Sequence, residues 1–533
     1  MKKYLLSIFT LITPFLTFAQ EAADKGIDQI IDEKFGDATG WFVNAVFYQV
    51  PFSEDVKIYW VLFPLILGAL YFTVYFKFIN FSGFFTSINI VRGNYDDLED
   101  RANHKVEISK SKFTDEDDNP DTIRIEGHEG EVSHFQALTA ALSATVGLGN
   151  IAGVAIAVSI GGAGATFWMI VAGFLGMASK FVECTLGVKY RDIEDDGTVY
   201  GGPMYYLTKG LKSKGLGGLG KVLAVLFAIF VIGGSFGGGN MFQVNQAFQL
   251  VENITGGENS FLHGNGWAFG VVMAILVGIV IIGGIKKIAK VTDKIVPFMV
   301  AIYVAASLFV IFANFSMLGD AFAQIYNGAF SPEGIAGGAV GVLVQGFRRA
   351  AFSNEAGIGS ASIAHSAVKT KYAASEGMVA LLEPFIDTVV VCTMTALVLI
   401  ITGNVAAENA SLNDAQAILL TSGAFESAIS WFPYVLTIAV VLFAFSSMIS
   451  WSYYGFQGWS YLFGRTKKAE YSYKILFCLF VIIGSAASLG SVIGFSDAMV
   501  FAMMVPNMVG LVILAPKVRD ELNKYMKAIK DRT

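Results

Sequence analysis

Long apolar runs, separated by short polar stretches, make up most of the chain. Eleven of these runs have about the 20 residues with which an α-helix crosses a bilayer. They lie near residues 58–76, 134–160, 163–186, 219–250, 266–286, 293–315, 334–366, 378–402, 430–455, 473–491 and 495–515. A transmembrane β-barrel would instead alternate apolar and polar residues in runs of about ten. The pattern therefore predicts an all-α membrane protein with eleven transmembrane helices.

The N-terminal end departs from this pattern. Residues 1–19 have the order of a signal peptide, with basic Lys2 and Lys3, then an apolar core, then a cleavage site ending at Ala19. A short anchoring helix that stays attached is the alternative. In either case we expect residues 20–56 to form a periplasmic segment, whose aromatic second part suits an interfacial helix.

The rest of the chain divides into five parts. We expect an extra transmembrane helix, a cytoplasmic insert, two halves of five spans each and a cytoplasmic tail. They are placed at residues 57–79, 80–131, 132–316, 333–515 and 516–533. A repeat with an odd number of spans is inverted when it recurs, so the two halves enter the membrane from opposite sides. The predicted architecture is a five-plus-five inverted repeat after one extra span.

Basic residues give the orientation. The loops assigned to the outside, near 252–264, 317–332, 403–429 and 491–495, contain no Lys or Arg, whereas the loops assigned to the cytoplasm contain them. This predicts a multi-pass protein of the bacterial inner membrane with a cytoplasmic C-terminus. Composition agrees, since only 15% of residues are charged and mean hydropathy is +0.58, while soluble proteins average about 25% charged residues.

Each half opens with a span that glycine interrupts, at Ser143–Gly153 and at Val344–Gly359. Interrupted helices in corresponding positions are typical of secondary transporters, because the freed peptide groups can hold a substrate and its coupling ion. In the first break, free amides at a half-helix N-terminus suit a carboxylate. The candidates there are Thr145, Gly147, Gly149 and Asn150. The alternative is that these glycines only allow close helix packing.

Uncharged polar groups elsewhere complete the predicted substrate site. Gln345 and Gly346 are expected at the depth of the first break, in contact with the substrate ammonium group. Phe242, Asn245 and Gln246 share one face of the fourth span, and an aromatic ring with two amides suits a small zwitterion. Hydrogen bonding between helices, away from any site, is the alternative for the two amides.

The charged residues of the second break are predicted to act as a gate. Arg348, Arg349 and Glu355 are expected nearer the cytoplasm than the substrate, where ion pairs can close the path. Glu183 and Lys180, at the end of the third span, are the predicted partners. For the arginines, snorkelling to the inner headgroups is the alternative.

The ninth span carries adjacent hydroxyl groups. Ser446 and Ser447, one turn after Phe443, can give a hard cation such as Na⁺ oxygen ligands. Serines that bond back to their own helix are the alternative. Trp451 follows one turn later and could close the substrate pocket; ordinary packing is the other possibility.

Five motifs in order resemble the alanine/glycine:cation symporter family. They are Gly147–Ala155 (GLGNIAGVA), Lys180–Arg191 (KFVECTLGVKYR), Gly201–Leu207 (GGPMYYL), Ser353–Ala361 (SNEAGIGSA) and Trp451–Gly455 (WSYYG). The chain departs from the expected pattern at Ser447 and Ser450, where Thr and Gly are more usual, and residues 97–128 look longer than normal.

The resemblance implies a LeuT-type fold and Na⁺- or H⁺-coupled uptake of alanine or glycine. It implies that Na⁺, the coupling ion, lies by Ser143, Val146, Phe443, Ser446 and Ser447. It also implies that Thr145, Asn150, Gln345, Gly346 and Trp451 surround the substrate.

The function we expect from the sequence is sodium-coupled import of a small neutral amino acid by alternating access. A proton-coupled carrier, or one with a broader range that includes serine or glutamine, is the alternative. An intramembrane hydrolase is disfavoured because Ser360 and His365 have poor spacing for a catalytic dyad, and a channel because polarity is confined to the two breaks and their neighbours. The expected partners are the amino acid and membrane lipid, with no nucleic acid, and the expected state is a monomer without enzymatic activity.

Overall fold

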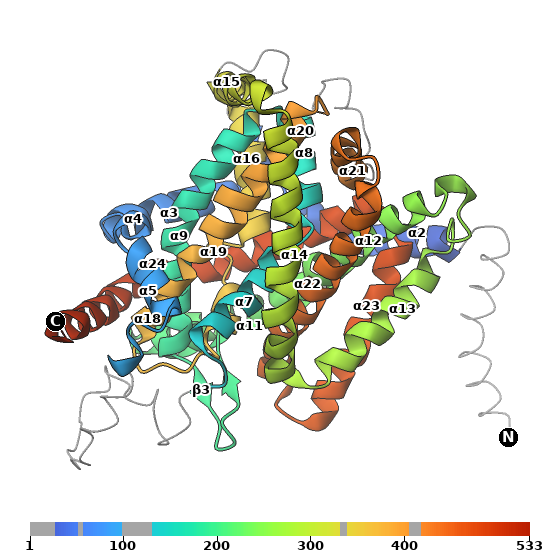
Figure 1. The fold of residues 1–533 in the computed structure, drawn as a ribbon. Coiled ribbons are helices and arrows are strands. Elements are labelled where there is room, and N and C mark those ends of the chain that lie inside the picture. Colours follow the sequence, from blue (N-terminus) through green and yellow to red (C-terminus); the bar gives the residue numbers. More distant parts are fainter. Residues whose placement is uncertain (1–26, 52–56, 99–129, 331–337, 405–416, 533) are drawn as a thin grey trace, which may run out of the picture.

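The computed structural model describes residues 27–51, 57–98, 130–330, 338–404 and 417–532, and these residues are mostly helical (Figure 1). The predicted signal peptide and nearly all of the stretch 97–128 lie outside the described residues. Two short antiparallel hairpins interrupt the helices. They pair β1 (Gln49–Pro51) with β2 (Lys57–Tyr59), and β3 (Asp192–Ile193) with β4 (Val199–Tyr200).

The N-terminal part packs on the outside of the helical bundle. Its helices are α2 (Ile27–Val46), α3 (Leu62–Tyr75), α4 (Ile79–Ser82) and α5 (Phe84–Val91). α2 contacts the C-terminal helix, with the rings of Phe35 and Phe495 edge to face at 5.1 Å. Asn80 is buried and donates to the Phe174 carbonyl at 3.1 Å. The stretch expected to begin a solvated insert at residue 80 therefore starts as packed helix, because residues 79–91 are largely apolar.

The part of the chain from residue 134 to 313 alternates α-helices with short π-helical turns and a 3₁₀ turn at residues 257–259. Its elements are α7 (His134–Thr145), η2 (Gly149–Gly153), α8 (Val154–Gly161), α9 (Ala165–Lys189), α10 (Pro203–Tyr205), η3 (Tyr206–Gly210), α11 (Gly217–Phe236), η4 (Gly237–Met241), α12 (Phe242–Ile254), η5 (Gly257–Asn259), α13 (Gly266–Ile281) and α14 (Gly284–Ala313).

The part of the chain from residue 315 onward has the same mixture of α-helices and short π- or 3₁₀-helical turns. Its elements are η6 (Phe315–Met317), α15 (Leu318–Phe330), α16 (Gly338–Asn354), α17 (Ala361–His365), α18 (Ala373–Ala380), α19 (Leu382–Pro384), η7 (Phe385–Cys392), α20 (Thr393–Ile401), α21 (Ala417–Ala428), α22 (Phe432–Phe463), α23 (Lys467–Ala486) and α24 (Leu489–Arg532). Helices from these two parts of the chain pack against one another: α16 packs on α9, α22 on α7, and α23 along α13 (Figure 1).

Seven described helices are long and apolar enough to cross a membrane, or eight if α7 and the η2–α8 segment form one bent span. The apolar helices α3 and α13 are too short to count among these seven, as is α16 with its 17 residues. The multi-spanning helical architecture is confirmed, and the count of eleven spans stays a prediction.

The first break lies where the glycines predict it. α7 ends at Thr145, Val146 is extended with φ −76° and ψ 92°, and the axes of α7 and η2–α8 meet at 53°. Extended backbone at Val146 takes its peptide groups out of the regular helical pattern.

The second break lies further along the chain than predicted around Gln345. α16 runs through Gln345 and Gly346 without interruption and ends at Asn354, after which Glu355, Gly357 and Gly359 adopt φ of 56°, 82° and 100°. The placement at Gln345 and Gly346 was wrong because glycine also serves close packing. A Cβ on Gly346 would lie 2.7 Å from the Ala165 carbonyl oxygen on α9.

Candidate functional site

The unwound turn of the first break is held by its own asparagine. Asn150 is fully buried, and its Oδ1 accepts a hydrogen bond from the Gly147 N–H at 2.8 Å. This contact caps a peptide group that the helix no longer pairs. The predicted role of Asn150 at the break thus has a structural counterpart, because its side chain fixes the shape of the turn.

The same asparagine joins the first break to the second half of the chain. Its Nδ2 donates to Ser353 Oγ at 3.0 Å and to Asp387 Oδ1 at 2.6 Å. Ser353 and Thr388 donate to Asp387 Oδ2 at 2.8 and 2.7 Å. The end of α16, the turn at η2 and the π-helical segment η7 therefore meet in one buried cluster, formed by Asn150, Ser353, Asp387 and Thr388.

Asp387 was not among the residues predicted from the sequence. The sequence does contain a feature that could have identified it, because Glu383 and Asp387 are carboxylates four residues apart within the apolar run 378–402. Carboxylates inside a membrane span are rare and default to a functional reading. The Asp387 side chain and carbonyl accept four described hydrogen bonds. Their donors, Asn150, Ser353 and Thr388, are all uncharged.

The predicted sodium ligands lie together where α7 meets α22. Ser143 Oγ donates to the Ser446 carbonyl at 2.8 Å, Ser447 Oγ to the Ser143 carbonyl at 3.0 Å, and Ser446 Oγ to the Phe443 carbonyl at 3.0 Å. All of these groups are buried, and Val146 is the next extended residue after α7. Hydroxyl and carbonyl oxygens are the donors that a hard cation prefers, so the set fits Na⁺ chemically.

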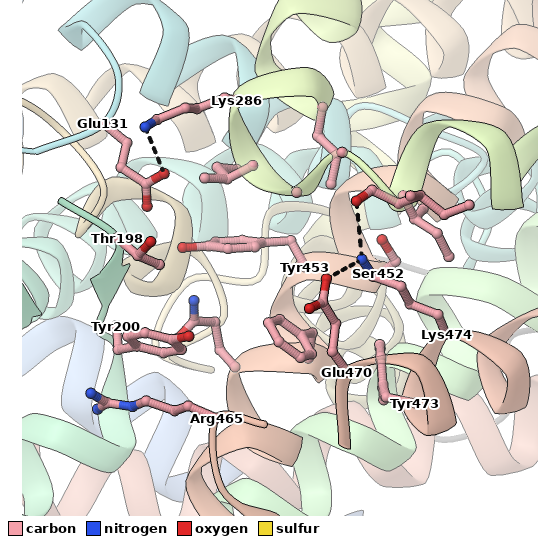
Figure 2. A pocket seen from close by; sticks show the side chains of 18 of the residues that line it. Glu131, Thr198, Tyr200, Lys286, Ser452, Tyr453, Arg465, Glu470, Tyr473 and Lys474 are labelled. Atoms are coloured by element: carbon pink, nitrogen blue, oxygen red, sulfur yellow. Dashed lines mark hydrogen bonds and ion pairs between the residues drawn. The ribbon is translucent and has the colours of Figure 1, made fainter. Parts of the chain in front are cut away.

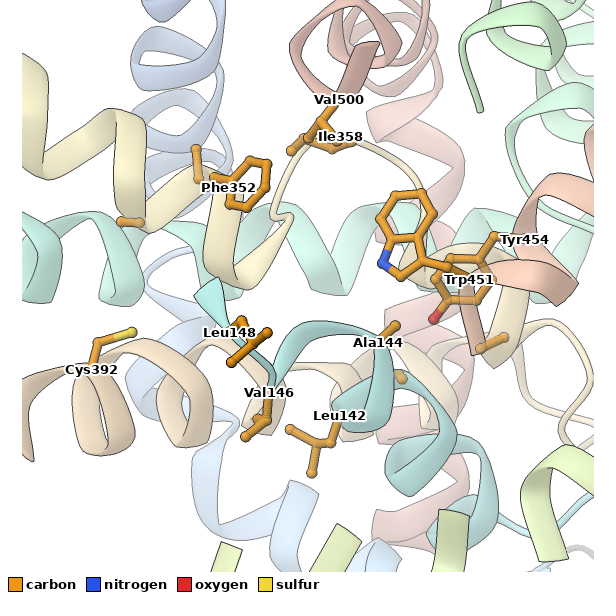
Figure 3. Packing of buried hydrophobic residues seen from close by; sticks show 14 of the residues in the cluster. Leu142, Ala144, Val146, Leu148, Phe352, Ile358, Cys392, Trp451, Tyr454 and Val500 are labelled. Carbon is orange, nitrogen blue, oxygen red and sulfur yellow. The ribbon is translucent and has the colours of Figure 1, made fainter. Parts of the chain in front are cut away.

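Glycines bring two aromatic rings close to this region. A Cβ on Gly239 of η4 would lie 2.1 Å from Trp451 Cγ, and one on Gly238 would lie 3.6 Å from the Phe352 ring. Phe352 also stacks edge to face with Phe242 at 5.3 Å. Figure 3 shows Trp451 and Phe352 near the break in α7, with Val146 and Leu148 on the break itself. The predicted aromatic residues Phe242 and Trp451 thus border the two breaks.

Gln243 of α12 contacts the first break, whereas Asn245 and Gln246 of the same helix were the residues predicted to act there. Its Oε1 accepts from the Leu148 N–H at 3.3 Å and its Nε2 donates to the Gly238 carbonyl at 3.0 Å. Asn245 instead donates to the carbonyls of Gly484 and Ala487 at 2.9 and 2.8 Å, which fastens α12 to the end of α23. Bonding between helices, the alternative for this amide, is therefore what Asn245 does.

Two other predicted substrate residues take no part in the hydrogen bonds described for this cluster. Gln345 packs beside Gly161 at the far end of α8, since a Cβ on Gly161 would lie 3.1 Å from the Gln345 Cβ. Eight residues of continuous helix, about 12 Å, separate Gln345 from Ser353. Thr145 bonds back to the Ala141 carbonyl of its own helix at 3.2 Å.

Arg348 and Arg349 lie on α16, before the second break, and their predicted location toward the cytoplasm stays a prediction. Both pair with Asp497 near the start of α24, at 2.7 and 3.3 Å. The Arg348 guanidinium also lies over the rings of Phe47 and Tyr59, at 4.7 and 5.3 Å, in the segment assigned to the periplasm. Because α16 ends at Asn354, both arginines precede the break in the chain.

The ion pairs described for these arginines are with Asp497, whereas Glu183 and Lys180 were the predicted partners. Glu183 lies 4.0 Å from Lys180, which binds Glu383 at 3.1 Å. Glu355 lies at the break, where it accepts a hydrogen bond from Ser360. The charged residues therefore form two separate groups, one on each side of the second break.

A cavity of about 400 Å³ lies beside Glu131 and Lys286 (Figure 2). It is lined by the β3–β4 hairpin, the turn between α13 and α14, and the facing parts of α22 and α23, including Ser452 and Tyr453 next to Trp451. Glu131 and Lys286 face each other across it at 3.9 Å. Burial raises the pKa of Glu131, outweighing the Val199 N–H and Lys286, which lower it.

Comparisons with known proteins agree on one family. A model described as the sodium:alanine symporter family matches residues 118–533. The chain is 42% identical over 407 residues to the sodium/alanine symporter AgcS of Methanococcus maripaludis, covering 76% of this chain and 87% of that protein. It is 34% identical over 404 residues to the probable sodium/glutamine symporter GlnT of Bacillus subtilis, covering 75% and 80%.

A solved structure supports the fold. MhsT in complex with L-phenylalanine superposes with a TM-score of 0.52 at 15% identity, covering 75% of this chain and 99% of that one. This neighbour has the LeuT fold, which confirms the predicted fold type. The family and this neighbour are transporters and not enzymes.

Proposed function

The chain belongs to the sodium:alanine symporter family, and we propose that it imports a small neutral amino acid, alanine or glycine, together with Na⁺. The observation that carries this proposal is the meeting of both helix breaks at Asn150, Ser353 and Asp387, beside the oxygen set of Ser143, Ser446 and Ser447. A multi-pass location in the plasma membrane follows from the family and from the apolar helices.

In this proposal the first break holds both ligands. Peptide groups freed around Gly147 and Gly149 bind the substrate carboxylate, and Trp451 and Phe352 cover its small side chain. Na⁺ binds to the hydroxyls and carbonyls between α7 and α22, including Val146. Because Ser143 belongs to α7 and Ser447 to α22, an ion between them favours one relative position of the two helices.

Alternating access then needs a seal on each side of the site. The ion pairs of Arg348 and Arg349 with Asp497 close the outer side, while the cavity at Glu131 and Lys286 provides the path to the cytoplasm. We also retain as a proposal the two five-helix repeats, at 132–316 and 333–515, which the fold neighbour supports.

The second candidate is a carrier with a broader or different neutral substrate. The similarity to GlnT favours it, because that relative is named for glutamine at an identity of 34%. A proton in place of Na⁺ is the other variant.

Uptake of labelled amino acid into proteoliposomes tests the proposal. Alanine or glycine uptake should rise with an inward Na⁺ gradient and not with an equal K⁺ gradient. Glutamine uptake exceeding alanine uptake would favour the second candidate. Uptake that follows a pH gradient and ignores Na⁺ would reject sodium coupling.

A further inference from the structure

A chain of seven buried titratable side chains runs along the side of the second break away from Arg348. We call it the charged network, and its members are His134, Glu376, His365, Glu383, Lys180, Glu183 and Glu355. Six of them have at most 3% of their surface exposed, whereas the His134 side chain, at the start of α7, is 12% exposed. Among these seven residues, His134 is therefore the one through which the network reaches the protein surface.

The outer part of the network is a relay of histidines and glutamates. His134 Nδ1 contacts one oxygen of Glu376, and the other oxygen lies 2.5 Å from His365 Nδ1. His365 Nε2 then lies 3.4 Å from Glu383 Oε2. Each group in this series can accept or donate a proton depending on its state.

The inner part ends at the second break. The other Glu383 oxygen lies 3.1 Å from Lys180 Nζ, and Glu183 lies 4.0 Å from the same nitrogen. Glu355, which Ser360 hydrogen-bonds, interacts electrostatically with Lys180. Asn507 of α24 closes the group by donating to Glu183 at 3.3 Å and to the carbonyl of Gly357, within the break, at 2.9 Å.

The charges of the network do not balance without bound protons. It contains four carboxylates, and Lys180 is its one permanently charged base. An uncompensated charge in a buried site costs several kcal/mol, so further protons must reside on the histidines or the carboxylates. Other titratable groups facing the network are Cys184, Arg191, Tyr206, Asp387 and Tyr454. Asp387 adds a further carboxylate, and Arg191 is engaged by the carbonyls of Ser366, Val368 and Thr370.

We propose that Glu355, with Lys180, Glu183 and Glu383, forms a proton-binding site that exchanges with the cytoplasm through His365, Glu376 and His134. The proton is the ligand, and it moves between oxygen and nitrogen atoms without any bond to carbon changing. Because Glu355 and Gly357 belong to the break, the protonation state of the site sets how firmly the break is held against α9 and α24. This site is separate from the substrate and Na⁺ groups, and only its link to the transport cycle rests on the proposed function.

The first test needs no substrate. Infrared difference spectra of the full-length purified protein, between about pH 6 and about pH 9, report the C=O stretch of protonated carboxyl groups. The Glu355→Gln variant should lose the band of one carboxyl group relative to the wild type. Identical difference spectra in the two proteins would overturn the proposal.

A second variant guards against misfolding in the first. Ser360→Ala keeps the Glu355 carboxyl and removes its hydrogen bond, so the band should remain and titrate at a shifted pH. An unchanged midpoint would assign the band to another carboxyl group and overturn the role of Glu355.

The third measurement links the site to transport. L-alanine is added in Na⁺ to weakly buffered protein, and a pH indicator reports the protons taken up or released. The Glu355→Gln variant should exchange less than about one third of the protons that the wild type exchanges. Glu521→Gln serves as the control and should match the wild type, because it removes a carboxylate of α24 that pairs with Lys189 and Lys524. Thermal stabilisation by alanine without proton exchange would overturn the link. Absence of stabilisation in the wild type would count against the proposed substrate, and the infrared result would still decide the proton site.

Discussion

The two helix breaks meet in one cluster but are built from different chemistry. The first is neutral: Asn150 caps the Gly147 N–H, and Gln243 caps the Leu148 N–H. The second follows from three alternate residues with positive φ, Glu355, Gly357 and Gly359, and it is flanked by charge on both sides. Neutral groups that define one conformation suit ligand binding, whereas ion pairs suit a segment that must be held in one position and released from it.

The largest effect should come from removing the cap of the first break. Asn150→Ala removes the hydrogen bonds of its side chain to the Gly147 N–H and to Asp387 Oδ1, which should cost about 2–4 kcal/mol and reduce alanine uptake to background. Uptake and the melting temperature measure the two effects. Asn245→Ala is the matched control, because it also removes a buried amide with two hydrogen bonds but away from the breaks. If both variants lose alanine binding equally at matched amounts of folded protein, the first break has no special role.

The next largest effect should be on sodium. Replacing both Ser446 and Ser447 by Ala removes two hydroxyl ligands and should raise the Na⁺ concentration for half-maximal uptake by at least about tenfold, or about 1.4 kcal/mol. Gln345→Ala, on α16 and away from this set, should leave that concentration near the wild-type value. Equal sodium dependence in the two proteins would reject the ion-site assignment.

A smaller effect is expected at the outer seal. Asp497→Asn removes the carboxylate shared by Arg348 and Arg349, so the outer side should open more often. Maleimide labelling of Ser496→Cys from outside, in a background without Cys184, Cys392 and Cys478, should become faster by about fivefold to tenfold.

Glu252→Gln is the control for this seal, since Glu252 forms a more exposed pair with His263. Its labelling rate should match that of the parent protein. Slower labelling in Asp497→Asn would mean that the ion pairs hold the outer side open.

The smallest effect should be at the β3–β4 hairpin beside the cavity. Burial raises the pKa of Asp192, but hydrogen bonds and attraction from Lys209 and Arg465 outweigh it and hold the pKa below its usual range. Because the pKa of Asp192 is lower in the folded than in the unfolded protein, its ionised form stabilises the fold at pH values above the unfolded pKa. This contribution to stability is lost as the pH falls through the pKa of the folded protein. Because the pairs are partly exposed, it should be under about 1 kcal/mol. Melting temperatures of wild type and Asp192→Asn, compared at about pH 7 and about pH 4, should converge at the lower pH.

The sequence predicts the first break well because three glycines crowd around an amide that can cap its own turn. It predicts the second break less well, since Gly346 and Gly357 look alike in sequence while one serves packing and the other a left-handed turn. Arg348 and Arg349 therefore precede the observed break, although they were predicted to lie beyond the substrate contact at Gln345. Ser446 and Ser447 were chosen because two adjacent hydroxyls follow an apolar run, and their role as ion ligands stays a prediction.

Partners far apart in the chain could not be predicted from local pattern. Asp387 lies 237 residues from Asn150, and only the fold brings their side chains to 2.6 Å. Gln243 was overlooked because it has the same residue type and helix as Gln246, and helical register alone does not say which face meets the break.

The central claim is that the two breaks and the serine set form one site for an amino acid and Na⁺. Thermal stabilisation by L-alanine, measured in Na⁺ and in K⁺ at equal ionic strength, tests it most directly. We predict that alanine raises the melting temperature in Na⁺ well above its effect in K⁺, and that replacing Ser446 and Ser447 by Ala abolishes the difference. Equal stabilisation in both salts, or unaltered sodium preference in the double variant, would contradict the account.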